Sequence, residues 1–298
     1  MKCLVTGGAG FIGSNLVDHL LENGHQVIVV DNESANSHDE YYWNSSADNY
    51  KFDIGMNNLD KLVDVCEGVD CIFHLASDVS ISYCIEKPAN SFMNNVGATS
   101  AVLEAARLSK VKKVIFSSTA AIYGLADKIC LETDKPDPLN SYSVSKLSGE
   151  HLMKMYNDLY NVKTVILRYF NVYGPRQPKS GQYAPVIGIF SRQKKEGKTL
   201  TVVGDGRQTR DFIHVSDIAA ANLTVAEKDV DLYGQIYNVG TGKASSIKVI
   251  AEMISDKIDY IPPRPAEARQ SLANVSKIKS AYGWKSEINL QEWIKENA

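Results

Sequence analysis

A short apolar run at residues Lys2–Thr6 leads directly into a glycine-rich turn, Gly7-Gly8-Ala9-Gly10-Phe11-Ile12-Gly13. Gly7, Gly10 and Gly13 have the spacing at which a strand passes through a tight turn into a helix. Glycines at these positions let the backbone approach a pyrophosphate, whose charge then lies at the positive end of the helix. This feature predicts a strand–turn–helix unit that can bind a dinucleotide.

Strand and helix patterns alternate from this turn to about residue 170. Apolar runs bounded by turn residues predict strands, and apolar positions at helical spacing predict helices between them. The predicted strands are Lys2–Thr6, Gln26–Asp31, Cys71–Ala76, Val111–Ser118 and Thr164–Phe170, and the predicted helices are Phe11–Glu22, Asn90–Leu108 and Tyr142–Tyr160. This order predicts an α/β fold with a parallel, doubly wound sheet, the Rossmann arrangement.

The regular alternation of strand and helix patterns ends after residue 170. The segment Gly174-Pro175-Arg176-Gln177-Pro178 then predicts a loop. We therefore expect residues 1–170 to form the dinucleotide-binding core. Residues 171–298 are expected to form mainly a smaller C-terminal α/β lobe that binds the substrate, with some segments returning to the core. The polar segment Asn32–Tyr50 is predicted to be a loop beside the cofactor.

Composition excludes several classes of partner. A net charge of -3 over 298 residues provides no basic field that would attract nucleic acid. No apolar run reaches the roughly 18 residues of a membrane span, and no secretory leader pattern is present. Scattered cysteines without a C-x-x-C pair fit a reducing compartment better than a disulfide framework or a metal site; they are Cys3, Cys66, Cys71, Cys84 and Cys130. We expect a cytoplasmic protein that binds no metal.

Asp31 closes the second predicted strand, about 18 residues after Gly13. A carboxylate at this position can accept hydrogen bonds from an adenosine ribose, whereas it would repel a 2'-phosphate. NAD is therefore favoured over NADP. Asp53-Ile54 and Leu75-Ala76 are expected along the path of the same dinucleotide.

Tyr142 lies four residues before Lys146, which places both side chains on one face of the predicted helix. A tyrosine ordinarily ionises near pH 10, and a nearby ammonium favours the phenolate. We expect Lys146 to lower the pKa of Tyr142 until it can act as a general base. Thr119, at the end of the predicted strand containing Ser117 and Ser118, can bring a hydroxyl to the same substrate oxygen.

Together these residues resemble the extended short-chain dehydrogenase/reductase family, in its NAD-dependent branch of nucleotide-sugar epimerases and dehydratases. The resemblance runs nearly end to end through Thr6–Gly13, His74–Ala76, Asn94–Gly97, Ser117–Gly124, Tyr142–Lys146, Arg168–Pro175, Gly204–Gly206, Arg210–Asp217 and Tyr237–Gly240. It implies NAD as the cofactor, a UDP-sugar as the substrate, and a homodimer formed through the helices at 90–108 and 142–160.

The resemblance also assigns expected roles to single residues. Besides the positions above, Phe11, Ile12, Asn32, Asn95, Ser117 and Tyr169 are expected to contact NAD, as are Tyr142 and Lys146. Substrate contacts are implied for Ser118, Thr119, Asn171, Arg210, Arg264, Glu267 and Ser271. Arginines suit the diphosphate because their planar fork of donors matches phosphate oxygens.

Ala120 and Ala121 bear on the reaction. In the dehydratases of the family an Asp-Glu pair follows the threonine, and the related decarboxylases usually keep a glutamate at the second position. Neither alanine can transfer a proton. This pattern resembles the UDP-glucose 4-epimerase branch, in which Tyr142 would remove the 4-hydroxyl proton while hydride passes to NAD and later returns to the other face of a 4-keto sugar.

The sugar and two other functions stay open on the sequence. The position matching Ser271 often carries tyrosine in relatives limited to UDP-glucose and UDP-galactose, so serine implies room for N-acetylated sugars. A reductase or a 5-epimerising relative would need another acid, for which Cys84 and His214 are available. A protein that binds NAD without catalysis is the third possibility, although such proteins commonly lose the tyrosine or the lysine.

Overall fold

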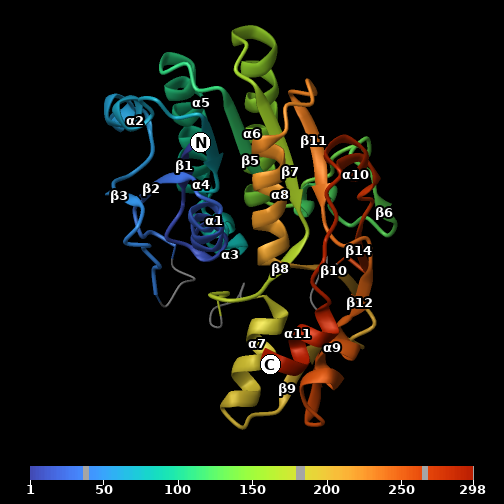
Figure 1. The fold of residues 1–298 in the computed structure, drawn as a ribbon. Coiled ribbons are helices and arrows are strands. Elements are labelled where there is room, and N and C mark those ends of the chain that lie inside the picture. Colours follow the sequence, from blue (N-terminus) through green and yellow to red (C-terminus); the bar gives the residue numbers. More distant parts are fainter. Residues whose placement is uncertain (36–39, 179–184, 264–267, 298) are drawn as a thin grey trace.

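The computed structural model describes residues 1–35, 40–178, 185–263 and 268–297. Its largest element is a seven-stranded parallel sheet (Figure 1). In spatial order its strands are β11 (Gln235–Val239), β7 (Thr164–Tyr169), β5 (Lys113–Thr119), β4 (Cys71–His74), β1 (Lys2–Thr6), β2 (Gln26–Asp31) and β3 (Asp48–Lys51). The strand order reverses between β1 and β4, and ligands bind at such switch points. The predicted doubly wound α/β fold is confirmed.

Helices cover both faces of this sheet, because alternate residues of each strand point to opposite sides. In β1, Cys3 and Val5 pack in one apolar cluster and Leu4 in the other, and all three are fully buried. The first cluster includes α1 (Phe11–Glu22), α8 (Val215–Glu227) and α10 (Ser276–Tyr282), and the second includes α2 (Leu59–Val65), α5 (Ala98–Leu108) and α6 (Ser141–Tyr160). Burial on two sides explains the continuous apolar runs of the sequence.

The helix predicted at residues 90–108 is interrupted in the structure. It consists of α4 (Pro88–Phe92), a π-helical turn (Met93–Gly97) and α5 (Ala98–Leu108). A short helix α3 (Ile81–Glu86) precedes it. Inside the π-helical turn, Asn95 is buried and bonds to Asp78 and Ser145 rather than following a regular helical face. Single π-turns of this kind occur frequently at functional sites.

The prediction of a loop through residue 50 is wrong at its end, because β3 begins at Asp48 and pairs with β2. All four residues of β3 are exposed at the edge of the sheet, so no apolar pattern marks them as a strand. A short helical turn, η1 (Met56–Asn58), follows before α2.

The second half of the chain adds a smaller sheet and returns to the large one. The smaller sheet contains β8 (Asn171–Tyr173), β10 (Thr209–His214), β12 (Ala244–Ser246), β14 (Gln270–Ala273) and β6 (Ile129–Cys130), while β9 (Leu200–Val203) pairs with β13 (Ile258–Ile261). The helices α7 (Val186–Lys195), α9 (Ile247–Ile254) and α11 (Leu290–Asn297) gather beside β9 at the lower end of the molecule in Figure 1. Strand β11 and helix α8 pack with the large sheet. The expected boundary between residues 170 and 171 lies between β7 and β8 and stays a proposal.

The five cysteines are all buried and none forms a disulfide. In the described ranges, no helix combines the length and apolar character that crossing a bilayer requires. No cluster of three or more His, Cys, Asp or Glu side chains that could hold a metal occurs among those same residues.

Candidate active site

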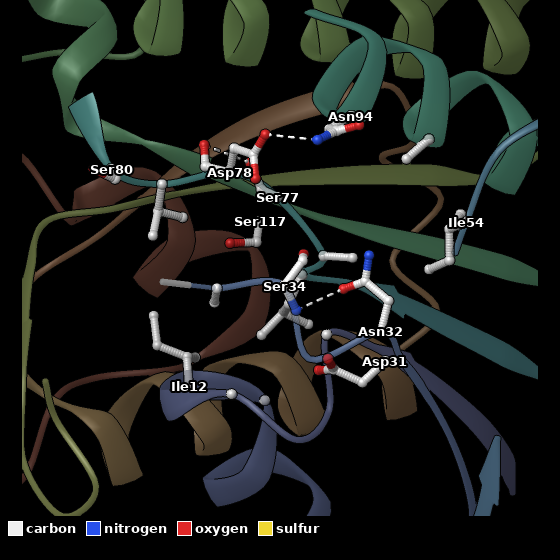
Figure 2. Close-up of a pocket in the computed structure, with 18 of the residues that line it drawn as sticks. Ile12, Asp31, Asn32, Ser34, Ile54, Ser77, Asp78, Ser80, Asn94 and Ser117 are labelled. Atoms are coloured by element: carbon white, nitrogen blue, oxygen red, sulfur yellow. Dashed lines mark hydrogen bonds between the residues drawn. The ribbon is translucent and has the colours of Figure 1, made fainter. Parts of the chain in front are cut away.

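A cavity of about 690 Å³ lies where the strands of the large sheet end at the switch point. This volume is within the range of about 300–1,000 Å³ that is usual for small-molecule sites. Many of the predicted site residues line it together: Gly7, Gly10, Phe11, Ile12, Gly13, Asp31, Asn32, Asp53, Ile54, Leu75, Ala76, Ser117, Ser118, Thr119, Tyr142, Lys146 and Tyr169. Figure 2 shows Asp31, Asn32 and Ile54 at one side of the pocket and Ser77, Asp78 and Ser80 at another.

The glycine turn can only be built from glycines at two of its positions. Gly7 has a φ of +69°, and a Cβ there would lie 2.8 Å from the backbone nitrogen of Ala76. A Cβ on Gly13 would lie 2.1 Å from the carbonyl oxygen of Gly7. Gly10 precedes α1 and supplies no side-chain cap, so the first N–H groups of this helix remain available beside the cavity. This arrangement suits a pyrophosphate.

Asp31 is buried at the end of β2, and its carboxylate is fixed by two backbone donors. The N–H of Ala9 donates to Oδ2 at 3.0 Å, and the N–H of Glu33 donates to Oδ1 at 2.8 Å. A carboxylate has about four acceptor positions, so two remain for ribose hydroxyls. Beside it, Asn32 donates to Asp53 at 2.5 Å, which ties β2 to the loop after β3. These groups fit the adenosine end of a dinucleotide.

Tyr142 and Thr119 meet at the cavity from α6 and β5. The Thr119 hydroxyl accepts the N–H of Ala121 at 3.1 Å, which leaves its proton for another acceptor. Burial raises the pKa of Tyr142 to about 12, and a hydrogen bond with Thr119 opposes this shift. The expectation that Lys146 lowers the pKa of Tyr142 is wrong in this structure, because desolvation of the phenol outweighs the other influences on it.

Lys146 also lines the cavity, and its side chain is buried. Its Nζ lies 4.4 Å from the centre of the Phe116 ring. Desolvation lowers the pKa of Lys146 to about 7, while the negative charge of Glu150 raises it. Burial therefore makes Lys146 lose its proton more easily, and the carboxylate of Glu150, one helical turn further along α6, opposes this effect.

Glu150 is a residue of the site that the sequence reasoning missed. Its Oε1 accepts the hydroxyl of Ser118 at 2.5 Å and Nε of Arg168 at 2.8 Å, and its Oε2 accepts Nη2 of Arg168 at 2.7 Å. All three side chains are buried. The signal was present in the sequence, because Tyr142, Lys146 and Glu150 follow one another at intervals of four residues.

Ser118 lines the cavity, but its hydroxyl proton is directed to Glu150. It remains available to a ligand only as an acceptor. Its predicted contact with substrate stays a prediction. Tyr169 also lines the cavity, where its hydroxyl exchanges hydrogen bonds with Asn222 and bonds with Ser117.

Asn95 does not line the cavity. Its side chain accepts the N–H of Asp78 at 2.7 Å, donates to the Asp78 carbonyl at 3.1 Å and donates to the Ser145 hydroxyl at 2.8 Å. Asn95 thus fastens the loop after β4 to the helix that carries Tyr142, and its predicted contact with NAD stays a prediction. His74 is buried between the hydroxyls of Thr6 and Thr99, and burial lowers its pKa to about 3, so it is neutral.

Of the predicted substrate residues in the second half, the described ones (Asn171, Arg210 and Ser271) lie in the smaller sheet and do not line this cavity. Asn171 donates to the carbonyl of Asp211 at 2.9 Å from β8, beside β10. Arg210 and Ser271 are register partners on β10 and β14, and the Arg210 guanidinium bonds to the Thr209 carbonyl. The remaining predicted pair, Arg264 and Glu267, lies outside the described residues.

We predict that the protein binds NADH at least about tenfold more tightly than NADPH, because Asp31 would repel a 2'-phosphate. Replacing Asp31 by asparagine removes the charge and should reduce this preference. Fluorescence titration of both cofactors measures it. The matched control is Asp64→Asn, which removes an exposed carboxylate of α2 outside the cavity and should leave the ratio unchanged. Tighter binding of NADPH by the natural sequence would show that the role given to Asp31 is wrong.

Comparisons of the sequence and of the fold with known proteins point to the same family. The family model described as the NAD dependent epimerase/dehydratase family matches residues 3–240. A putative UDP-glucose 4-epimerase of Methanocaldococcus jannaschii is 37% identical and aligns over 98% of this chain and 95% of its own length.

Two similar solved structures are named after different sugar substrates. A UDP-N-acetylglucosamine 4-epimerase from Methanobrevibacter ruminantium, in complex with UDP-N-acetylmuramic acid, has a TM-score of 0.90 at 33% identity, covering 99% of this chain and 96% of its own. A UDP-glucuronic acid 4-epimerase from Bacillus cereus, in complex with UDP-glucuronic acid and NAD, has a TM-score of 0.90 at 31% identity, covering 100% and 98%. With the glycine turn and the cavity it opens into, these matches show that the chain belongs to the NAD dependent epimerase/dehydratase family and uses NAD.

Proposed function

We propose that this protein catalyses the NAD-dependent 4-epimerisation of a UDP-sugar through a transient 4-keto intermediate. The observation that carries the proposal is the meeting of Tyr142, Lys146 and Thr119 in the cavity that also contains the glycine turn. The substrate pair is UDP-glucose and UDP-galactose, with the N-acetylhexosamine pair as a further substrate. Names of similar proteins support a UDP-sugar 4-epimerase as the class.

In this proposal Tyr142 takes the proton of the sugar 4-hydroxyl and Thr119 donates a hydrogen bond to the same oxygen. The high pKa of Tyr142 means that the proton must leave against a strong preference for the neutral phenol. When bound, NAD would supply the acceptor for the hydride, and its positively charged nicotinamide in a buried cavity would favour the Tyr142 phenolate. Lys146, when it is protonated, would bind the ribose of the nicotinamide.

The two residues after Thr119, Ala120 and Ala121, carry no acid or base, and this favours epimerisation over elimination of water. Ala120 and Ala121 form the short turn that follows β5, and their methyl groups cannot carry a proton. Loss of water from C5 and C6 needs an acid and a base at that position. Oxidation and reduction at C4 need only the tyrosine and the cofactor. The sequence at these two positions therefore supports oxidation and reduction at C4 without loss of water.

The nucleotide end of the substrate is assigned to the smaller sheet. We propose that Asn171 and Arg210 bind the diphosphate, together with Arg264 and Glu267 for the phosphate and the nucleoside ribose. Ser271 would leave room for an acetamido group. Support comes from β8, β10 and β14 being neighbours, which places Asn171, Arg210 and Ser271 in one sheet beside the described end of the cavity at Phe170 and Val172.

Assembly and location are also proposed. A homodimer through α5 and α6 would cover Met155 and Leu159, whose exposed fractions are 37% and 67%. Leu152, expected on the same face, packs partly against the core instead. The free, buried thiols fit a reducing compartment, and we propose the cytoplasm.

We predict that the purified protein with NAD converts UDP-galactose to UDP-glucose, and UDP-N-acetylgalactosamine to UDP-N-acetylglucosamine. Proton NMR of the anomeric signals in a mixture follows both reactions at once. Tyr142→Phe should retain NADH binding but lose at least about 100-fold in rate, as expected for a general base. Conversion of the first pair alone would remove the role given to Ser271. No conversion of either pair would contradict the proposal.

We also predict that Glu150→Gln moves the alkaline limit of the epimerisation rate down by about one pH unit. The carboxylate of Glu150 raises the pKa of Lys146, so removing its charge lets the ammonium lose its proton at lower pH. The rate is measured from pH 5 to 10 on samples first shown to be folded by circular dichroism. Glu104→Gln is the matched control, because Glu104 also accepts two bonds from an arginine, Arg107, but on α5 outside the cavity. A loss of stability with an unchanged pH profile would contradict the predicted role.

A further inference from the structure

The comparisons leave the sugar open between neutral hexoses, N-acetylated hexosamines and hexuronates, and one carboxylate in the cavity bears on this choice. Asp78 lines the cavity in the loop between β4 and α3. Figure 2 shows its side chain beside Asn94 and Ser77, apart from Asp31 and Asn32. Asn94 Nδ2 donates to Oδ2 of Asp78 at 2.9 Å, which holds the carboxylate in place.

Asp78 belongs to the Tyr142 side of the cavity. Its backbone is held by Asn95, which also donates to Ser145, and the Ser145 hydroxyl donates to the carbonyl of Tyr142 at 2.8 Å. The Cys84 thiol donates to the carbonyl of Asp78 at 3.5 Å.

The charged groups that line the described part of the cavity are unbalanced. They are Asp31, Asp53, Asp78 and Lys146. Asp31 and Asp53 flank Asn32 at the adenosine end, and Lys146 is buried beneath Tyr142. Asp78 is therefore the carboxylate nearest to the proposed sugar position among the described lining residues. A like charge there costs binding energy in a partly desolvated site.

The described residues next to Thr119 in the sequence offer no side-chain donor to an acidic sugar. A sugar carboxylate needs hydrogen-bond donors or a cation. Ala120 and Ala121 have no polar side-chain atoms, and the hydroxyl proton of Ser118 is already given to Glu150. These surroundings differ from what a hexuronate would require.

We propose that Asp78 is a specificity residue that excludes hexuronate nucleotides and so restricts the enzyme to sugars without a carboxylate. This inference rests on the proposed UDP-sugar function. Asp78 discriminates by charge: its carboxylate and the C6 carboxylate of a hexuronate repel each other across the cavity, while the neutral C6 hydroxymethyl group of a hexose meets an acceptor of hydrogen bonds.

The experiment measures the dissociation constants of UDP-glucose and UDP-glucuronic acid by calorimetry on the NADH-bound protein, which has no hydride acceptor and cannot turn either sugar over. The natural sequence should bind UDP-glucose at least about tenfold more tightly, and Asp78→Asn should reduce the ratio of the two constants by about tenfold. The asparagine keeps the shape of the side chain. Glu86→Gln removes an exposed carboxylate of α3 outside the cavity and should leave the ratio unchanged.

An Asp78→Asn ratio equal to that of the natural sequence would overturn the proposal, as would equal or tighter binding of UDP-glucuronic acid by the natural sequence. Binding is measured without turnover, so the ratio still tests Asp78 if no sugar is epimerised and the reaction proposal fails. If neither sugar nucleotide binds, both proposals are wrong. An equal change of the ratio in Glu86→Gln would show that overall charge, rather than Asp78, controls the selectivity.

Discussion

The buried ion pair between Glu150 and Arg168 holds together the elements that carry Tyr142, Lys146 and Thr119. It joins α6, which carries Tyr142 and Lys146, to β7, and through Ser118 to the end of β5 next to Thr119. A buried pair of charges stabilises a fold only when its hydrogen bonds are well made, and removing one partner costs about 3–5 kcal/mol. Both carboxylate oxygens are bonded here, so the pair fixes three elements against one another at the site.

The same burial that fixes these groups sets their ionisation. It raises the pKa of Tyr142 to about 12 and lowers that of Lys146 to about 7, so burial shifts both groups toward their neutral forms. A positive charge entering such a cavity is weakly screened and acts strongly on the phenol. The oxidised cofactor brings such a charge, so in the proposed function the tyrosine becomes a base only in the loaded enzyme.

Patterns in the sequence predicted the parts of the fold where burial is complete. The runs in β1, β2 and α1 agree with the structure to the residue, because alternate burial on two faces leaves a continuous apolar signal. Strand β3 was missed because its four residues are exposed. The carboxyl ends of parallel strands meet at one edge of the sheet. For this reason the sequence could predict that the glycine turn, Thr119 and Tyr142 lie at one site.

Other features depend on contacts that no local pattern reveals. The pairing of Ser118 with Glu150 and the raised pKa of Tyr142 both follow from packing between elements distant in sequence. Asn171, Arg210 and Ser271 were assigned by resemblance, and the structure places them in the smaller sheet. The role proposed for the Asp78 carboxylate could not be inferred from the sequence, because it depends on the loop after β4 facing the cavity.

Transfer of hydride from C4 and back is the central claim, and isotope labelling tests it most directly. UDP-galactose carrying deuterium at C4 is converted by the NAD-bound protein, and the product is analysed by mass spectrometry and NMR. Retention of deuterium at C4 of UDP-glucose, with none released to solvent or to free NADH, is the predicted result. Loss of the label to solvent would contradict a hydride that leaves and returns within one site, and so would a failure to form any UDP-glucose.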